Sequence, residues 1–391
     1  MAGKHNIAEF AVELEATPGT AETIVVGDVL VKIRDGYTIT PDQELIDLDE
    51  VSSVSTQPAA VIGRRGVTFA VDYVLRGPGD LTTDPAVSDL WLSALFTGAQ
   101  ASTIAIGAIA GGPYFAGETI TGTTSAGTGL VLQRTADSAL TIPYLPLTGA
   151  LVTTETLTGS ESAATSTSSA GPIDGGYAFR PADWQTGTGH HVTCKAFRDG
   201  YQWTGRGCLS DLSFAMNNGG PCIVTQNFLG ALTAQGDAAL FGVTTFPEST
   251  VVVPKFLNAT IVFGTFSPNG IVDVNINWPT NPTFVEDAND PAGDGIVFTD
   301  YNRDIPTVSL EVDQELAATY DFFGNMQAGT LQNFELTHGA GGAAGSRWTF
   351  SCDKAQFRSI GVGNRDPQRA TFIIELGLTG SNNEELLIWQ H

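Results

Sequence analysis

The sequence predicts a mostly-β (α+β) protein with two tandem β-sandwich or barrel-forming domains, each with one helix, and a small β insertion domain. Three observations predict this fold. Only 15% of the 391 residues are charged while Gly, Thr and Ser are abundant, which suits short strands and turns better than long helices. Apolar residues, at 42%, suffice for packed cores. Two parts of the chain also repeat a similar order of expected elements.

The first hundred residues alternate apolar and polar side chains, as strands do. We expect strands at Thr23–Ile33 and Val67–Leu75, with a strand end and a long exposed acidic loop between them. A helix is expected next, because Asp84 can cap its amino end, Pro85 suits its first turn and Gly98 can end it. Its apolar face would consist of Val87, Leu90, Trp91, Ala94 and Leu95.

Strand patterns return after residue 190 and continue through the rest of the chain, with a second helix expected within Asp313–Met326. The order strand, helix, strand, strand therefore occurs twice. In this alignment Cys194 matches Cys352, and Asn227–Thr233 matches Glu375–Thr379. The repeated order predicts an internal duplication.

The resulting organisation has a first domain in two parts, residues 1–106 and 177–240, a β insertion over 107–176, and a second domain over 250–391. The insertion contains GETITGTTSAGTG and, 37 positions later, TETLTGSESAATS, which are identical at seven of thirteen places. A plain linker would not need the apolar residues between these copies, so we expect a compact core there, formed by Leu130, Val131, Leu132, Leu140, Ile142, Tyr144 and Leu145.

The net charge of −24 restricts the function. Nucleic acid is bound largely through Lys and Arg that neutralise phosphates, and this balance opposes such binding. An acidic surface could still line a path along which DNA slides without sticking, although solubility alone is the commoner reason for such a charge. No apolar stretch approaches the roughly 18 residues of a membrane span, so no membrane partner is expected.

The candidates for metal chemistry have structural explanations. Cys194, Cys208, Cys222 and Cys352 lack CxxC spacing and are expected to be small buried residues. His190 and His191 would point to opposite faces of a strand, and His338 and His391 have no evident partners. The stretch DANDPAGDG, at Asp287–Gly295, has Asp and Asn at calcium-loop spacing but lacks the final Glu, so an exposed turn is favoured over calcium.

No catalytic constellation emerges either, and we expect the chain not to be an enzyme, with no catalytic, cofactor-binding or metal-ligating residues. The Gly-rich run Gly339–Ser346 precedes a strand and has no Lys, so a hairpin or flexible loop is expected rather than a phosphate loop. The aromatic residues fit periodic core positions: Phe69, Tyr73, Trp91, Phe96, Phe228, Trp348 and Phe350. The grouped carboxylates are expected in solvated loops: Asp42 and Glu44; Asp47, Asp49 and Glu50; Asp287 and Asp290; Glu384 and Glu385.

Several segments, in this order, resemble the tail tube protein (major tail protein) of long-tailed bacteriophages. They are an opening AVELEATPGTAETI, the strand-then-helix unit GRRGVTFAVDYVLRG with DPAVSDLWLSALFTG, the segment GYQWTGRGCLSDLSFAMNNGGPCIVTQNFLGAL, and the closing RDPQRATFIIELGLTGSNNEELLIW. The likeness covers most of the chain except the insertion, and its specificity lies in the order of the segments.

The resemblance implies a virion protein, assembled in the host bacterial cytoplasm, whose sheets pair between subunits into rings that stack as a hollow tube for DNA delivery. Ring closure also removes exposed sheet edges, and the acidic charge would let DNA pass without specific binding. Two tube domains per chain favour a trimeric ring with pseudo-sixfold symmetry, a hexamer being the alternative. The implied partners are other copies, the tail terminator, the tape measure and tail-tip proteins, with the insertion outside the ring.

Two other functions stay open at this point. One is a different structural role in a phage particle, as a decoration, head or tail-tip protein. The other is a carbohydrate-binding adhesin, which clustered exposed aromatic side chains would favour. A β-rich depolymerase would need paired carboxylates in a cleft, and nothing in the sequence supports one.

Overall fold

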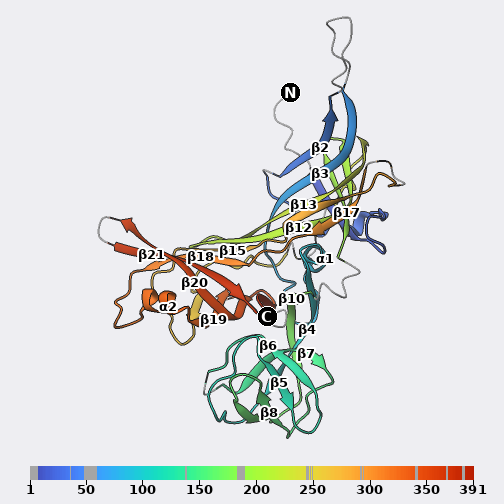
Figure 1. Cartoon of the computed structure of the whole chain (residues 1–391). Coiled ribbons are helices and arrows are strands. Elements are labelled where there is room, and N and C mark those ends of the chain that lie inside the picture. The colour runs from blue at the N-terminus through green and yellow to red at the C-terminus, as the bar shows by residue number, and fades with distance from the viewer. Residues whose placement is uncertain are drawn as a thin grey trace, which may run out of the picture.

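The computed structural model describes residues 8–35, 37–47, 60–136, 139–182, 190–243, 246, 248, 250–290, 293, 295–339, 342–366, 369–380 and 384–391. Strands make up 54% of the described residues and helices 4%, which confirms the mostly-β class. Twenty strands join into one antiparallel network, and β16 (Pro282–Glu286) and β17 (Ile296–Tyr301) form a separate hairpin. Figure 1 shows an elongated molecule with one arm at the upper right, a second at the left, and a compact lower lobe.

The first unit of the network is a six-stranded sheet. Its spatial order is β1 (Ala8–Leu14), β11 (Val192–Arg198), β12 (Tyr201–Asn217), β13 (Cys222–Asp237), β3 (Val61–Val74) and β2 (Thr38–Ile46). The long hairpin of β12 and β13 is its centre. Side chains alternate along β3, with Val67, Phe69, Val71 and Tyr73 buried, as expected for a sheet with one face on a core.

The second unit repeats that spatial order with different strands. They are β14 (Thr260–Phe263), β19 (Leu331–His338), β20 (Trp348–Asp366), β21 (Arg369–Thr379), β18 (Thr307–Asp313) and β15 (Asp273–Trp278). The order along the chain also repeats, since a helix follows β3 and β18 in turn. The repeat of strand order agrees with the expected duplication, whose origin stays a prediction.

Equivalent rows of residues can be traced across the two sheets. Phe228 on β13 lies between Phe69 on β3 and Ser210 on β12. Ile374 on β21 likewise lies between Leu310 on β18 and Ile360 on β20. Around these rows, one pattern of burial is shared by Phe228–Thr233 and Ile374–Thr379. The register of the two units therefore matches.

The strand order corrects one detail of the sequence alignment. Cys194 lies on β11, whose counterpart is β19, whereas Cys352 lies on β20, the counterpart of β12. The two cysteines are not equivalent, because a shared strand-like pattern does not fix which strand of a sheet a segment becomes. The closing segments Asn227–Thr233 and Glu375–Thr379 do fall on counterpart strands, β13 and β21.

Both helices are shorter than expected. The first, α1 (Ser88–Leu92), is preceded by Val87 rather than Asp84, and it ends before Leu95, whose φ of 62° is left-handed, so that Gly98 lies in the next strand. The second, α2 (Phe322–Ala328), starts at Asp321, whose carboxylate accepts from the Gly324 amide, and ends at the left-handed Gly329. Asp313 is instead the last residue of β18, and residues 314–320 form turns and irregular structure before the helix.

Thr23–Ile33 is not the expected strand. It contains a single 3₁₀ turn, η1 (Val26–Asp28), and one isolated bridge from Ile33 to Tyr73. Val25 and Val26 are exposed. The segment has strand-like residues, but in the described chain it meets β3 only at its end, through this single bridge, so no ladder forms, and pairing decides strand formation more than propensity does.

The insertion leaves the first unit through β4 (Phe96–Ala105) and returns through β10 (Ile173–Pro181), which pair with each other. The predicted limit at residue 176 thus falls inside β10. Between them lie β5 (Thr119–Gly122), β6 (Thr128–Val131), β7 (Thr141–Thr148), β8 (Thr156–Gly159) and β9 (Thr165–Thr167). These strands surround a core of their own that includes Ile120, Ile142 and Leu157. Of the expected core residues only Leu140 is exposed, because it precedes β7 at the surface.

The two copies of the insertion repeat cap each other. Glu118 of the first copy accepts hydrogen bonds from the amides of Glu161 and Ser162 in the second, at 3.1 and 3.0 Å. Glu155 of the second accepts from the amides of Thr124 and Ser125 in the first, at 3.3 and 3.0 Å. Both glutamates are buried. The repeat therefore encodes a small pseudo-twofold domain in which each half completes the turns of the other.

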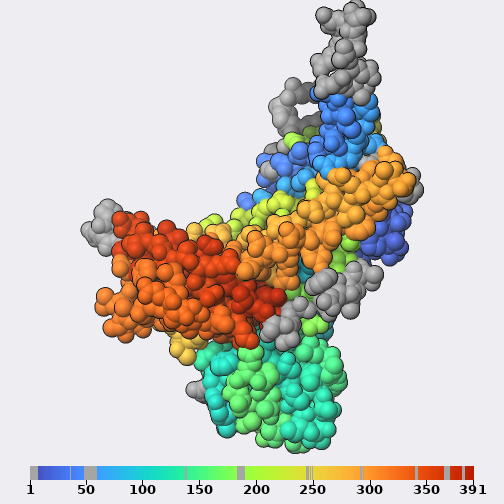
Figure 2. All heavy atoms as spheres, in the orientation of Figure 1, coloured from blue at the N-terminus to red at the C-terminus, as the bar shows by residue number. Residues whose placement is uncertain are grey.

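The insertion is fastened to the second unit, although it interrupts the first. The Glu335 carboxylate accepts from the Gln133 side chain at 2.7 Å and from the Arg134 amide at 3.0 Å. Lys354 pairs with Glu161 at 2.8 Å, and β10 pairs with the last strand, β22 (Leu387–Gln390). Figure 2 shows the insertion as a distinct mass seated against the second unit.

Candidate assembly interface

The two units are joined by a strand-to-strand pairing at the end of β12. The first half of β12 pairs with β11, whereas Leu212–Asn217 pairs with Asp273–Trp278 of β15, so that the sheet continues from one unit into the other. Leu212 lies opposite Trp278, Phe214 opposite Ile276, and Met216 opposite Val274. All six of these side chains are completely buried. The junction is therefore part of the main hydrophobic core.

Polar contacts fix the register of this junction. The Trp278 indole N–H donates to the Ala94 carbonyl at 2.8 Å, and the Arg303 guanidinium lies 4.4 Å from the centre of the Trp278 ring. At the end of β15, the Asp211 carboxylate accepts from the amides of Thr280 and Asn281, both at 2.8 Å. A slip by one residue would break these bonds and turn the apolar side chains outward.

The strand β2 occupies the same place in the first unit that β15 occupies in the second. Within the described residues β2 pairs with β3 alone, and its other edge faces solvent. Apart from Ile39, which is half-buried against the main core, its side chains are exposed, including Leu45 at 65% and Ile46 at 48%. Asp42, Gln43 and Glu44 separate the apolar residues. Polar and charged side chains on an open edge are a common protection against indiscriminate strand pairing.

The second open edge belongs to β20. Its first part, up to Gln356, is flanked by β19, but the part from Phe357 to Asp366 pairs only with β21 among the described strands. Val362 is 67% exposed, and Ile373 on β21 is 51% exposed. This is the region of β20 that corresponds to the β15-binding part of β12. Figure 1 places the β20–β21 arm at the opposite end of the molecule from β2.

The stretch from Asp287 to Gly295, for which the sequence favours an exposed turn over calcium, is anchored by an arginine. The Asp290 carboxylate lies 2.9 Å from the Arg206 guanidinium, and both side chains are nearly inaccessible to solvent. Arg206 also donates to the carbonyls of Ile296 and Val297, at 2.8 and 3.0 Å. It thereby fastens the β16–β17 hairpin to β12. Nothing in the local sequence around Arg206 indicates this long-range pair.

The grouped carboxylates do not all lie in solvated loops. Asp42, Glu44 and Asp47 are exposed, and Asp49 and Glu50 lie outside the described residues. Asp42 and Glu44 lie on the strand β2, the Asp290 side chain is nearly inaccessible and Glu384 is buried, which corrects the expectation of solvated loops for these four. Glu385 pairs with Arg303 at 3.1 Å. Long-range contacts to arginine and to neighbouring strands are invisible to a local reading of the sequence.

The histidines and cysteines are built into the core. His191 Nε2 lies 2.7 Å from the Thr299 carbonyl, and burial lowers the pKa of both His190 and His191. Burial also lowers the pKa of His338 and of His391 to about 4. All four cysteines are free and buried, as expected, and so are the seven predicted core aromatic residues. In the described part of the chain, no three His, Cys, Asp or Glu side chains gather as metal ligands.

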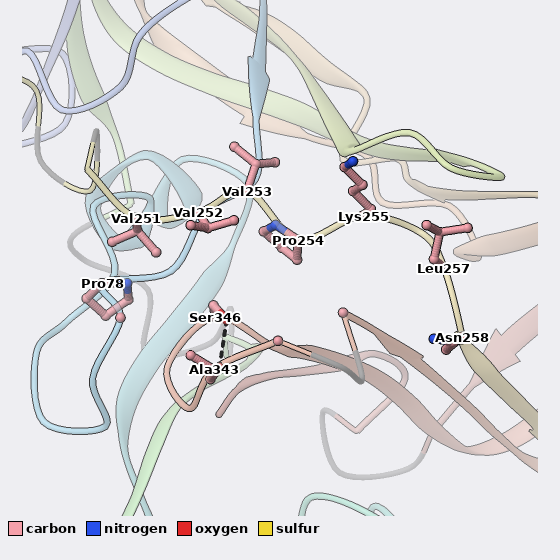
Figure 3. A pocket seen from close by; sticks show the side chains of 13 residues that line it. Pro78, Val251, Val252, Val253, Pro254, Lys255, Leu257, Asn258, Ala343 and Ser346 are labelled. Carbon is pink, nitrogen blue, oxygen red and sulfur yellow. Dashed lines mark hydrogen bonds between the residues drawn. The ribbon is translucent and has the colours of Figure 1, made fainter.

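A hollow of about 560 Å³ lies between Val251–Asn258 and the loop that joins β19 to β20. Figure 3 shows its lining, which is mostly apolar, with Lys255, Asn258 and Ser346 as polar members. The Ser346 hydroxyl already donates to the Ala343 carbonyl at 2.7 Å. No pair of acidic or nucleophilic side chains converges there among the residues that line it, so the hollow suggests no reaction. The Gly339–Ser346 run forms this β19–β20 connection, as predicted.

Comparison with known proteins does not identify a family, since no protein-family model and no curated sequence matches the chain. Among the described helices, none is long and apolar enough to cross a membrane. The open edges of β2 and β20 are therefore the features from which a function can be argued.

Proposed function

We propose that this protein is a self-assembling structural protein, the tail tube protein of a long-tailed bacteriophage, which forms stacked rings around a channel for DNA. The observation that carries the proposal is the continuous sheet across the β12–β15 junction, with the equivalent positions left open at β2 and β20. A head-to-tail pairing of those edges would repeat the internal junction, and such repetition closes into a ring when the rotation permits it.

The charge of the chain supports the same proposal. A net charge of −24 gives a wall that repels phosphates, so that DNA can move along it without being held. The protein acts without catalysis or cofactors, its residence is the virion, and its partners are other copies and the proteins at the two ends of the tail. Two units per chain favour three chains per ring, six chains being the alternative.

Electron microscopy of the purified protein tests the proposal. We expect rings or hollow tubes of uniform bore, and native mass spectrometry of released rings distinguishes three chains from six. A protein that stays strictly monomeric at high concentration, alone and with a tail-tip initiator, would contradict the tube.

A further inference from the structure

We propose that Gln43 on β2 of one copy lies opposite Val362 on β20 of the next, so that the chains join in the register of the internal β12–β15 junction. The inference rests on the proposed ring-forming function and names the partner and the pairing of its open edges. It follows from the equivalence of the two units, in three steps.

In the internal junction β15 pairs with β12, and the counterpart of β12 in the second unit is β20. Gln226 on β13 pairs with Val71 on β3 and with Leu212 on β12. The equivalent row, two residues along from the row through Ile374, runs from Val312 on β18 through Phe372 on β21 to Val362 on β20. Val362 therefore stands where Leu212 stands in the first unit.

The other strand of the internal junction is β15, and its counterpart in the first unit is β2. Phe69 on β3 pairs with Ile39 on β2, and Leu310 on β18 pairs with Val274 on β15. Because Phe69 and Leu310 are equivalent, Ile39 corresponds to Val274. Four residues further along each strand, Gln43 corresponds to Trp278.

The pairing of β12 with β15 then predicts how β20 of one copy pairs with β2 of the next. Leu212 lies opposite Trp278 in the internal junction, so Val362 is assigned to Gln43 of the neighbouring copy. In the same ladder Ile360 faces Leu45, which is 65% exposed in the single chain. The pairing would cover apolar side chains that both open edges leave in water. It would also give partners to backbone groups of the two edges, although Pro41 supplies no N–H to either of its ladders.

The positions of the two open edges explain why one chain cannot pair them with each other. β2 and the free part of β20 lie at opposite ends of the molecule (Figure 1), so only another copy can bring them together. Each copy offers one edge of each kind, and the contact is therefore directional.

Disulfide cross-linking tests the register. In the double variant Gln43→Cys/Val362→Cys, opposed Cβ atoms on one face of an antiparallel pair come within disulfide range. We expect oxidation to link chains into covalent multiples and, in complete rings, into a closed species containing every chain. The native cysteines are buried, and the two single variants report any cross-linking that does not come from the pair.

The matched control is Gln43→Cys/Gly361→Cys. Gly361 is adjacent to Val362 and would carry its new side chain on the other face, and a Cβ there meets only ordinary contacts, at 3.8 Å from Ile373. The control should cross-link at least tenfold less. If microscopy shows rings but Gln43→Cys/Val362→Cys does not cross-link, or the control links as well, the register is wrong while the tube proposal stands. Cross-linked open chains without rings would support the register and contradict the tube. Absence of both rings and cross-links would overturn both.

Discussion

Strands β15 and β2 occupy the same place in two units of the same strand order, yet their environments are opposite. Val274, Ile276 and Trp278 of β15 are completely buried because β12 covers the far edge of that strand. In β2 the matching positions are Ile39, Pro41 and Gln43, and that edge has no partner in the described chain. The three internal positions are therefore all apolar and buried, whereas the three external positions include the polar residue Gln43.

This difference is consistent with the proposal that one repeated unit serves both folding and assembly. A junction formed during folding can be fully apolar, since it is never exposed in the native chain. An edge that would be covered only when another copy binds needs polar residues to keep the single chain soluble, and Asp42, Gln43 and Glu44 supply them. The external junction is therefore expected to be weaker and more specific than the internal one.

The largest effect is expected from breaking the internal junction. Trp278→Ala would remove a fully buried ring, its hydrogen bond to Ala94 and its contact with Arg303. We expect a loss of about 3–5 kcal/mol in the free energy of unfolding, measured by urea denaturation. Trp203→Ala is the control, because Trp203 is only partly buried. Equal losses in the free energy of unfolding for the two variants would show that Trp278 in the β12–β15 junction contributes no more to stability than a partly buried tryptophan elsewhere.

A smaller effect, on assembly alone, is expected at the external edge. Val362→Lys places a charge at the centre of the proposed ladder, at a site already 67% exposed. The free energy of unfolding should change by less than about 0.5 kcal/mol. The protein concentration needed for ring formation, measured by light scattering, should rise at least tenfold, about 1.4 kcal/mol.

Ile173→Lys is the matched control for this variant, since Ile173 is 69% exposed and lies on β10, away from both open edges. Its assembly should equal that of the wild type. If the two lysine variants assemble alike, the free edge of β20 is not part of an interface.

Local pattern accounts for much of the fold and for little of the junction. Alternation located most of β3, and the absence of CxxC spacing indicated that all four cysteines are small buried residues. The same patterns misplaced Thr23–Ile33, which alternates like a strand but meets β3 only through the isolated bridge from Ile33 to Tyr73. The pairing of β12 with β15 joins segments about sixty residues apart, and no periodicity encodes which edges meet. The buried Arg206–Asp290 pair was missed for the same reason.

The insertion sharpens the comparison, because its repeat closes on itself. Glu118 and Glu155 each cap the other copy, and the strands β5 and β8 pair antiparallel about the centre of the repeat. Among the described strands β5 to β9, none is longer than the eight residues of β7, so none has an unpaired edge as long as the Phe357–Asp366 part of β20. The repeat of the insertion thus joins two halves of one chain, whereas we propose that the repeat of the units also joins one chain to the next.

The smallest effect is expected from weakening this internal closure. Burial raises the pKa of Glu155, but hydrogen bonds from the Val152 and Ser125 amides outweigh it, and the net shift is below the ordinary value of 4.5. Glu155→Gln should cost about 1–3 kcal/mol, because a charged acceptor is lost where several donors converge. Hydrogen exchange of the β5 and β8 amides measures this loss locally.

The direction of the pH dependence separates this role from simple packing. A carboxyl whose pKa is lowered on folding contributes stability that is present above pH 4.5 and is lost as the pH falls through its folded pKa. Protection of β5 and β8 should therefore decline below about pH 4.5 in the wild type, with a shallower decline in Glu155→Gln. Glu161→Gln is the control, since Glu161 pairs with Lys354 in a partly exposed contact whose loss should cost less than about 1 kcal/mol. Identical pH profiles for the wild type and Glu155→Gln would mean that the apolar core alone holds the two copies of the repeat together. The charge of the capping glutamate would then contribute nothing to the stability of the insertion.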